Sequence, residues 1–139
     1  PLRAVDRTDD ALAALAAGNV PQARELAVEA GDVDSLAVDP LFALSEVESA
    51  AGQPVAAKAA LERAVKLQPA TPETWIRLAR FELLGGDAAA AQAAVRPALY
   101  LDPRSAPAQA VFIEASRKID EAAAAAKAEA EKPKKKSGS

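Results

Sequence analysis

The chain has 139 residues, of which 38 are alanine and only five are aromatic, and its net charge is −3. Alanine has the highest helix propensity and strand-forming residues are scarce, so this composition predicts an all-α protein with one domain. Histidine and cysteine are absent, which excludes imidazole and thiolate catalysis, disulfides and the usual zinc sites. We therefore expect no enzymatic activity, no catalytic residue, no metal and no cofactor.

The charge is distributed unevenly along the chain. Residues 1–116 contain 10 basic and 16 acidic residues, a balance of −6, whereas residues 117–139 contain seven basic and four acidic residues, a balance of +3. An acidic body repels phosphate backbones, which argues against nucleic acid as a partner. No segment approaches the ~18 consecutive apolar residues of a membrane span. Because the chain begins at Pro1 and contains no methionine, we expect further sequence upstream, and a membrane contact only through that region.

A period of 34 residues runs through the sequence. Gly18, Gly52 and Gly86 are each 34 residues apart, and several alanines, leucines and prolines keep the same register. Such a period is typical of a helical repeat protein, in which each unit is a pair of helices. The three copies fall at about 4–37, 38–71 and 72–105.

Local signals divide each copy into two helices. Asp39-Pro40 and Thr71-Pro72 are predicted helix starts, each an N-cap followed by proline at the first helical position. Gly52 and Gly86 are predicted left-handed residues that end the first helix of a pair. The predicted helices are 6–17, 20–30, 40–51, 54–67, 72–84 and 88–100. A seventh, capping helix is predicted at about 106–131, followed by a disordered basic tail at 132–139.

These residues resemble the tetratricopeptide repeat. In the third copy, the signature positions of that family hold Trp75, Leu78, Ala79, Gly86, Ala91, Val95, Ala98 and Pro103. The second copy matches well, whereas the first has Arg7, Asp10 and Ser35 where an aromatic residue, a leucine and the proline belong. The resemblance implies an α-solenoid of about three helix–turn–helix hairpins with a C-terminal capping helix, forming one domain over residues 1–131.

The resemblance also implies a binding surface. In this family the first helix of each hairpin lines a concave groove that binds protein or peptide segments. Carried over to this chain, the groove residues are Phe42, Glu46, Ile76, Arg77, Arg80 and Leu83. The apolar residues would form the floor and the arginines would bind acidic groups, so we expect an acidic and apolar segment as partner. The alternative is that the three apolar side chains pack only against neighbouring repeats and that Arg80 pairs with Glu46.

One specialisation of the family is excluded by single residues. Members that hold the C-terminal carboxylates of chaperones do so with lysine, asparagine and arginine side chains at five positions. This chain has Thr8, Leu12, Ala43, Glu73 and Arg77 there, and only the arginine fits. We therefore expect a partner other than a chaperone C-terminus.

A second resemblance concerns a larger protein. The segments 39–44, 61–69 and 98–105 resemble in sequence the C-terminal repeats of actinobacterial O-antigen ligase or polymerase-type membrane proteins. This resemblance implies an alternative function, a soluble accessory or self-associating domain of a membrane-bound glycan enzyme. The chain would then be bacterial and tethered to the cytoplasmic membrane, and it would form homo-oligomers.

Overall fold

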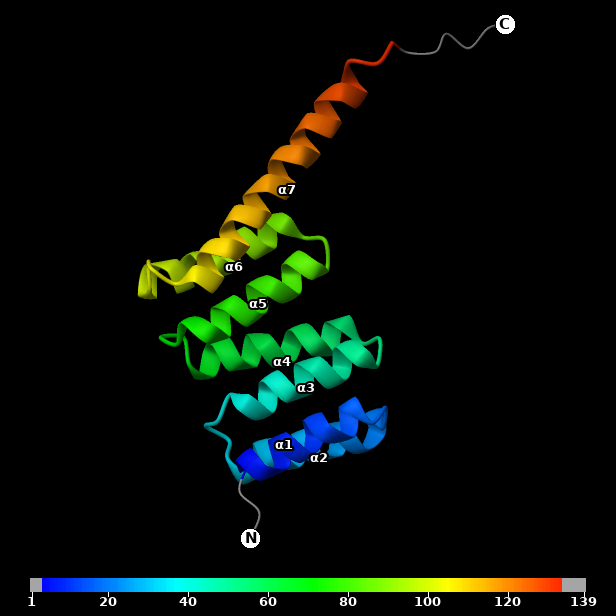
Figure 1. Ribbon diagram of the computed structural model, residues 1–139, viewed down its shortest axis with the longest axis vertical. Helices are drawn as coiled ribbons and strands as arrows, with labels where there is room; N and C mark the ends of the chain where they lie inside the picture. The colour runs from blue at the N-terminus through cyan, green and yellow to red at the C-terminus, as the bar shows by residue number, and fades with distance from the viewer. Residues whose placement is uncertain (1–3, 134–139) are drawn as a thin grey trace, which may run out of the picture.

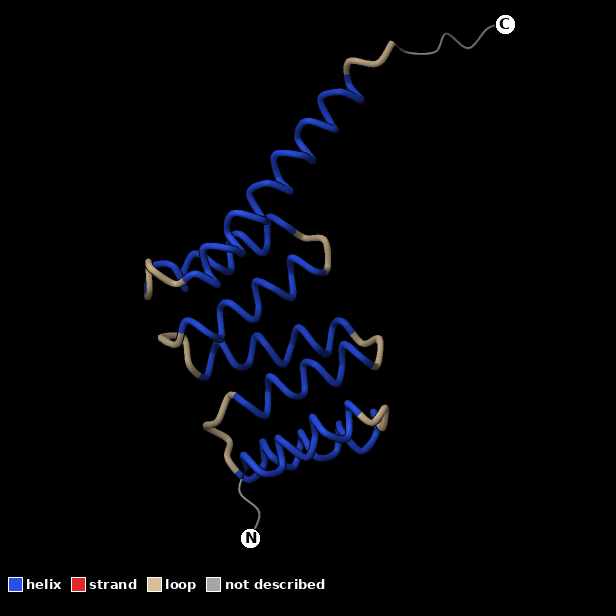
Figure 2. Tube along the Cα trace, in the orientation of Figure 1, coloured by secondary structure: helices blue, strands red, loops and turns tan. Residues whose placement is uncertain are grey.

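The computed structural model describes residues 4–133, with side chains from Asp6 onward, and within that range the protein contains seven helices and no strand (Figures 1 and 2). The helices are α1 (Ala4–Ala16), α2 (Val20–Val33), α3 (Asp39–Ala50), α4 (Pro54–Leu67), α5 (Pro72–Leu84), α6 (Ala88–Leu101) and α7 (Ala106–Ala130). The predicted all-α solenoid is confirmed, and each helix boundary lies within a few residues of its prediction.

The helices form consecutive hairpins that stack along one axis. α1 pairs with α2, α3 with α4 and α5 with α6, and α7 packs against α6 and α5 (Figure 1). Each hairpin contacts mainly its neighbours in sequence, so the core is continuous along the stack and has no single centre. The two ends of the described chain therefore lie at opposite ends of the molecule.

The three glycines of the 34-residue register make the turns inside the hairpins. Gly18, Gly52 and Gly86 have φ values of 82°, 72° and 88°, and no other described residue has a positive φ. In this left-handed conformation, which glycine adopts without a steric cost, the chain leaves one helix and starts the next within three residues. The predicted left-handed ends at Gly52 and Gly86 agree with this geometry.

The helix starts differ in two respects from their prediction. Val38, not Asp39, is the N-cap of α3, and Asp39 is already the first helical residue. At that position a carboxylate interacts favourably with the helix dipole without capping a backbone N–H. Thr71 does occupy the N-cap of α5, but its hydroxyl donates to Gln68 Oε1 at 3.2 Å and caps no backbone N–H.

Small residues allow the helices of each hairpin to approach closely. The equivalent alanines Ala23, Ala57 and Ala91 are completely buried. Val95 is also completely buried, whereas Trp75 is half-buried and its indole N–H donates to the Pro69 carbonyl oxygen at 2.7 Å. Alanine contributes little apolar area per residue, so the stability of this fold depends on close contact between the helices.

Equivalent polar pairs join each hairpin to the next. Glu48 is buried and accepts from Arg24 of the preceding hairpin at 2.5 Å, and Glu82 is buried and accepts from Lys58 at 2.8 Å. Each pair joins the second helix of one hairpin to the first helix of the next, 24 residues further along. At the equivalent position between α6 and α7, Gln92 Nε2 donates a 3.0 Å hydrogen bond to Ser116 Oγ. These pairs satisfy the two buried carboxylates and give them a structural role.

The Lys58–Glu82 pair predicts a pH dependence of stability. The hydrogen bond and the charge of Glu82 raise the pKa of Lys58 above its ordinary value. The resulting stabilisation is complete below the unfolded pKa of about 10.4 and is lost as the pH rises through the folded value. Lys58→Arg, which imitates Arg24, keeps its charge at high pH. In urea unfolding monitored by circular dichroism, the wild type should lose stability relative to this variant only above pH ~10; a constant difference from pH 7 to 12 would contradict the pair's role.

α7 extends beyond the stacked hairpins because it lacks the glycine that ends the first helix of each hairpin. The next position of the glycine register is Asp120, and α7 runs on to Ala130. Ala108, Val111 and Ala115 bury its first half against the third hairpin, whereas from Arg117 to Pro133 only Ile119 is even partly buried. The second half of the helix therefore projects from the stack (Figure 1).

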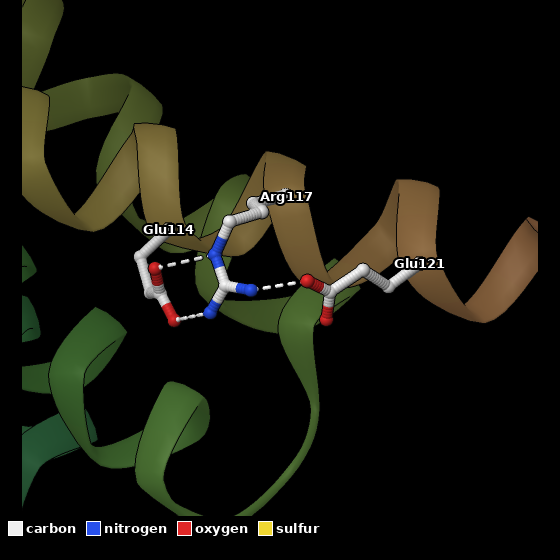
Figure 3. Close-up of polar contacts among 3 residues, drawn as sticks. All are labelled: Glu114, Arg117 and Glu121. Atoms are coloured by element: carbon white, nitrogen blue, oxygen red, sulfur yellow. Dashed lines mark hydrogen bonds and ion pairs between the residues drawn. The ribbon is translucent and has the colours of Figure 1, made fainter.

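Charged side chains support α7 where it leaves the body. Arg117 lies between Glu114 and Glu121, one turn away on either side (Figure 3). Its Nε donates to Glu114 Oε2 at 3.0 Å, and this bond holds the pKa of Glu114 below its ordinary value. Such pairs at three and four residues' spacing stabilise an exposed helix. Of the predicted basic tail at 132–139, only Lys132 and Pro133 lie within the described residues.

No helix among residues 4–133 combines the length and the apolar character needed to cross a bilayer. In the same range, no three side chains of the metal-binding types lie together as a metal site would require.

Candidate functional site

A first hollow lies between α1 and α3. Its volume is about 170 Å³, similar to the ~150 Å³ of a cavity that holds one benzene ring. Its lining residues are Thr8, Asp9, Leu12, Asp39, Phe42, Ala43, Glu46 and Arg77. The floor is the ring of Phe42, which is 5% exposed, and carboxylates lie around the rim.

A second hollow continues the first between α3 and α5. Its volume is about 290 Å³, and it shares Phe42, Glu46 and Arg77 with the first. It adds Ser45, Leu61, Arg80, Phe81 and Leu84. Phe81 and Leu84 also line a third, apolar hollow of about 290 Å³ near the end of α5, together with Ser49, Pro54 and Gly85. The second hollow thus shares lining residues with each of the other two, and the three adjacent hollows are together called the α1–α3–α5 groove.

Arg77 is held in the middle of this groove by three contacts. Its guanidinium lies 4.2 Å from the centre of the Phe42 ring, a cation–π contact. Its Nε donates to Glu73 at 2.8 Å, and its Nη1 lies 3.7 Å from Glu46 Oε1. Two carboxylates therefore compensate its charge, and the residue bridges two repeats across the groove.

Arg80 lies one helical turn further along α5 and is exposed. Glu46 pairs with Arg77, so the structure does not form the Arg80–Glu46 pair considered as an alternative. Within residues 6–133 the Arg80 guanidinium has no ion-pair partner. Its charge is available to a molecule in the second hollow.

Ile76 and Leu83 lie elsewhere. Ile76 is 3% exposed and packs with Val95 and Val111 in the core shared by α5, α6 and α7. Leu83 packs against the same core. Neither residue lines the groove. Of the six sequence-predicted groove residues, the structure brings together Phe42, Glu46, Arg77 and Arg80. It buries Ile76 in the core and packs the partly buried Leu83 against that core.

Two apolar groove residues were not selected from the sequence. Phe81 is half-buried, and Leu84 is 89% exposed at the end of α5. Adjacent helical side chains point about 100° apart, and here Leu83 packs against the core while Leu84 faces outward. The sequence offered no signal that Leu84, and not Leu83, faces the groove.

A separate hollow of about 300 Å³ lies between α2, α3 and α4. Apolar residues line it, with the charged residues Asp32, Asp34 and Arg63 around it. It involves the junction of the first two hairpins alone, whereas the α1–α3–α5 groove spans three hairpins. Its charged residues therefore provide matched controls for experiments on the groove.

Stacked antiparallel hairpins with a terminal cap define the class of helical repeat proteins. Within this class, a family model described as the tetratricopeptide repeat matches residues 38–81, which include the Phe42–Arg77 contact. Residues 38–81 thus match the tetratricopeptide repeat in sequence, and the chain has the fold of solved tetratricopeptide repeat domains.

Solved structures with this fold cover most of the chain. The Sgt2 domain from Aspergillus fumigatus is 22% identical with a TM-score of 0.74, over 97% of this chain and 88% of that one. The first such domain of human RPAP3 is 14% identical with a TM-score of 0.72, over 85% and 93%. The chaperone SycD of Yersinia enterocolitica, in complex with a peptide of the translocator YopD, is 16% identical with a TM-score of 0.64, over 83% and 88%.

No curated protein matches the chain. The second resemblance, to O-antigen ligase or polymerase-type membrane proteins, receives no support from these comparisons.

Proposed function

We propose that the protein is a non-enzymatic interaction module that binds an extended segment of a partner protein in the α1–α3–α5 groove. The observation that carries this proposal is the row of adjacent hollows across three hairpins, in which the first two share Phe42 and Leu84 is exposed at one end. An exposed leucine beside an aromatic floor stabilises a bound apolar side chain by removing both from water.

Proteins of the same fold support the proposal. A first tetratricopeptide domain of RPAP3 has been solved with an HSP90 peptide, and SycD has been solved with a YopD peptide. The partner of this chain has a different chemistry from a chaperone C-terminus, because Thr8, Leu12 and Ala43 supply no cation at the first two hairpins.

Peptides selected on the immobilised chain from a random dodecapeptide library test the proposal. Binding of the selected peptides, measured by fluorescence anisotropy, should weaken about tenfold or more with Leu84→Asp, because a charge would replace the apolar contact. Val55→Asp is the matched control, since Val55 is 83% exposed and lies outside the groove. Both variants should keep the helical circular dichroism spectrum.

Two results would overturn the proposal. One is a library that yields no peptide; the other is a set of peptides whose affinity is equal for the wild type and Leu84→Asp. A mass that rises with concentration in light scattering, without any peptide ligand, would favour the self-associating accessory domain instead.

A further inference from the structure

The two ends of the α1–α3–α5 groove carry opposite free charges. At the α1–α3 end, Asp9 and Asp39 are exposed and line the first hollow. Within residues 6–133 neither carboxylate has an ion-pair partner. At the α5 end, the exposed guanidinium of Arg80 lines the second hollow, again without an ion-pair partner in that range.

The middle of the groove offers no free cation among the described residues. Arg77 is compensated by Glu73 and Glu46, and its guanidinium covers one face of the Phe42 ring. The sequence expectation of an acidic and apolar partner counted Arg77 and Arg80 as two free cations. Because Glu73 and Glu46 already pair with Arg77, the free cation of the groove is at its α5 end and free anions are at the other.

We propose that the groove selects a segment with a basic residue at the α1–α3 end, apolar residues in the middle and an acidic residue at the α5 end. The proposal rests on the peptide-binding function proposed above. A lysine or arginine placed in the first hollow pairs with Asp9 and Asp39. An aspartate or glutamate placed in the second hollow forms a charge-assisted bond with Arg80. Apolar side chains between them contact Phe42, Phe81 and Leu84. Charge complementarity of this kind selects a partner and its direction more strongly than it adds affinity.

Four synthetic peptides with one apolar centre test the charge order. Two are bipolar, with lysines at one end and glutamates at the other in both chain directions; one has glutamates at both ends and one has lysines at both ends. In fluorescence anisotropy at low salt, one bipolar peptide should bind about tenfold more tightly than either uniform peptide. The preference should fall as NaCl is added, because salt screens exposed charges.

Charge reversal on the protein should change which of the four peptides binds most tightly. Asp9→Lys combined with Asp39→Lys should make the doubly acidic peptide the tightest ligand, and Arg80→Glu should do the same for the doubly basic peptide. Asp32→Lys and Arg63→Glu make the same changes at the separate hollow and should leave the order unchanged. Circular dichroism would verify that every variant keeps its helices.

The outcomes separate this proposal from the proposed function. If all four peptides bind equally and lose binding with Leu84→Asp, the groove is the binding site and the charge order is wrong. If the control variants change the order of peptide affinities and the groove variants do not, the separate hollow is the binding site. The groove assignment and the charge order are then both wrong. If neither these peptides nor the library yields a ligand, the proposed function fails and the charge order fails with it.

Discussion

Replacing Ile76 with alanine is expected to lower the free energy of unfolding by about 2–5 kcal/mol. Ile76 packs with Ala79, Val95 and Val111 where α5, α6 and α7 meet. Truncation removes apolar contacts and leaves a cavity that alanines around it cannot fill. Because α7 is attached through this cluster, the cap should separate at lower urea concentration. Urea unfolding followed by circular dichroism measures the change.

Ile113→Ala is the matched control, since it removes the same atoms from a side chain that is 66% exposed. Its effect should stay within about 0.5 kcal/mol. Equal losses for the two variants would mean that Ile76 is not part of the core. Ile76 would then be available to a ligand, as the sequence predicted.

Enlarging Ala91 to leucine is expected to cost about 1–3 kcal/mol by overpacking. Ala91 is completely buried where α5 and α6 approach each other, and a leucine there forces the two helices apart. The loss should appear as a lower midpoint in thermal unfolding. It should be accompanied by weaker packing of Trp75, visible in its fluorescence.

Ala93→Leu provides the comparison on the same helix. Ala93 is exposed, so the leucine has nearly the same helix propensity but meets no neighbouring helix. Its midpoint should be close to that of the wild type. A similar loss at both positions would show that the close approach of α5 and α6 does not depend on a small residue.

Most of the fold could be predicted because its determinants are local. Glycines at a fixed period, prolines at helix starts and alanine-rich stretches act within a few residues, and they placed the helices within a few residues of their observed ends. The family resemblance supplied the stacking, which local signals do not contain. Asp39 shows the limit of local reasoning: it has the chemistry of an N-cap, but the helix begins one residue earlier.

The groove was predicted only in part, because side-chain partners depend on how the hairpins stack. The alternative considered from the sequence paired Arg80 with Glu46 by repeat equivalence, whereas the structure pairs Arg77 with Glu46. Ile76 was assigned to the floor of the groove from the groove positions of the family it resembles, which do not say how α7 packs on α5. Once α7 covers that face, Ile76 becomes interior. The direction of each side chain at a junction is thus a property of two hairpins together.

The pairs Arg24–Glu48 and Lys58–Glu82 make the two junctions of the stack chemically interchangeable. If residues 38–71 were deleted, α2 would be followed directly by α5, and Arg24 would face Glu82 as it now faces Glu48. A hairpin could likewise be duplicated, since its first helix supplies the glutamate of one pair and its second helix supplies the lysine or arginine of the next. The molecule can therefore gain or lose a hairpin by a single recombination event without leaving a carboxylate unpaired at the new junction.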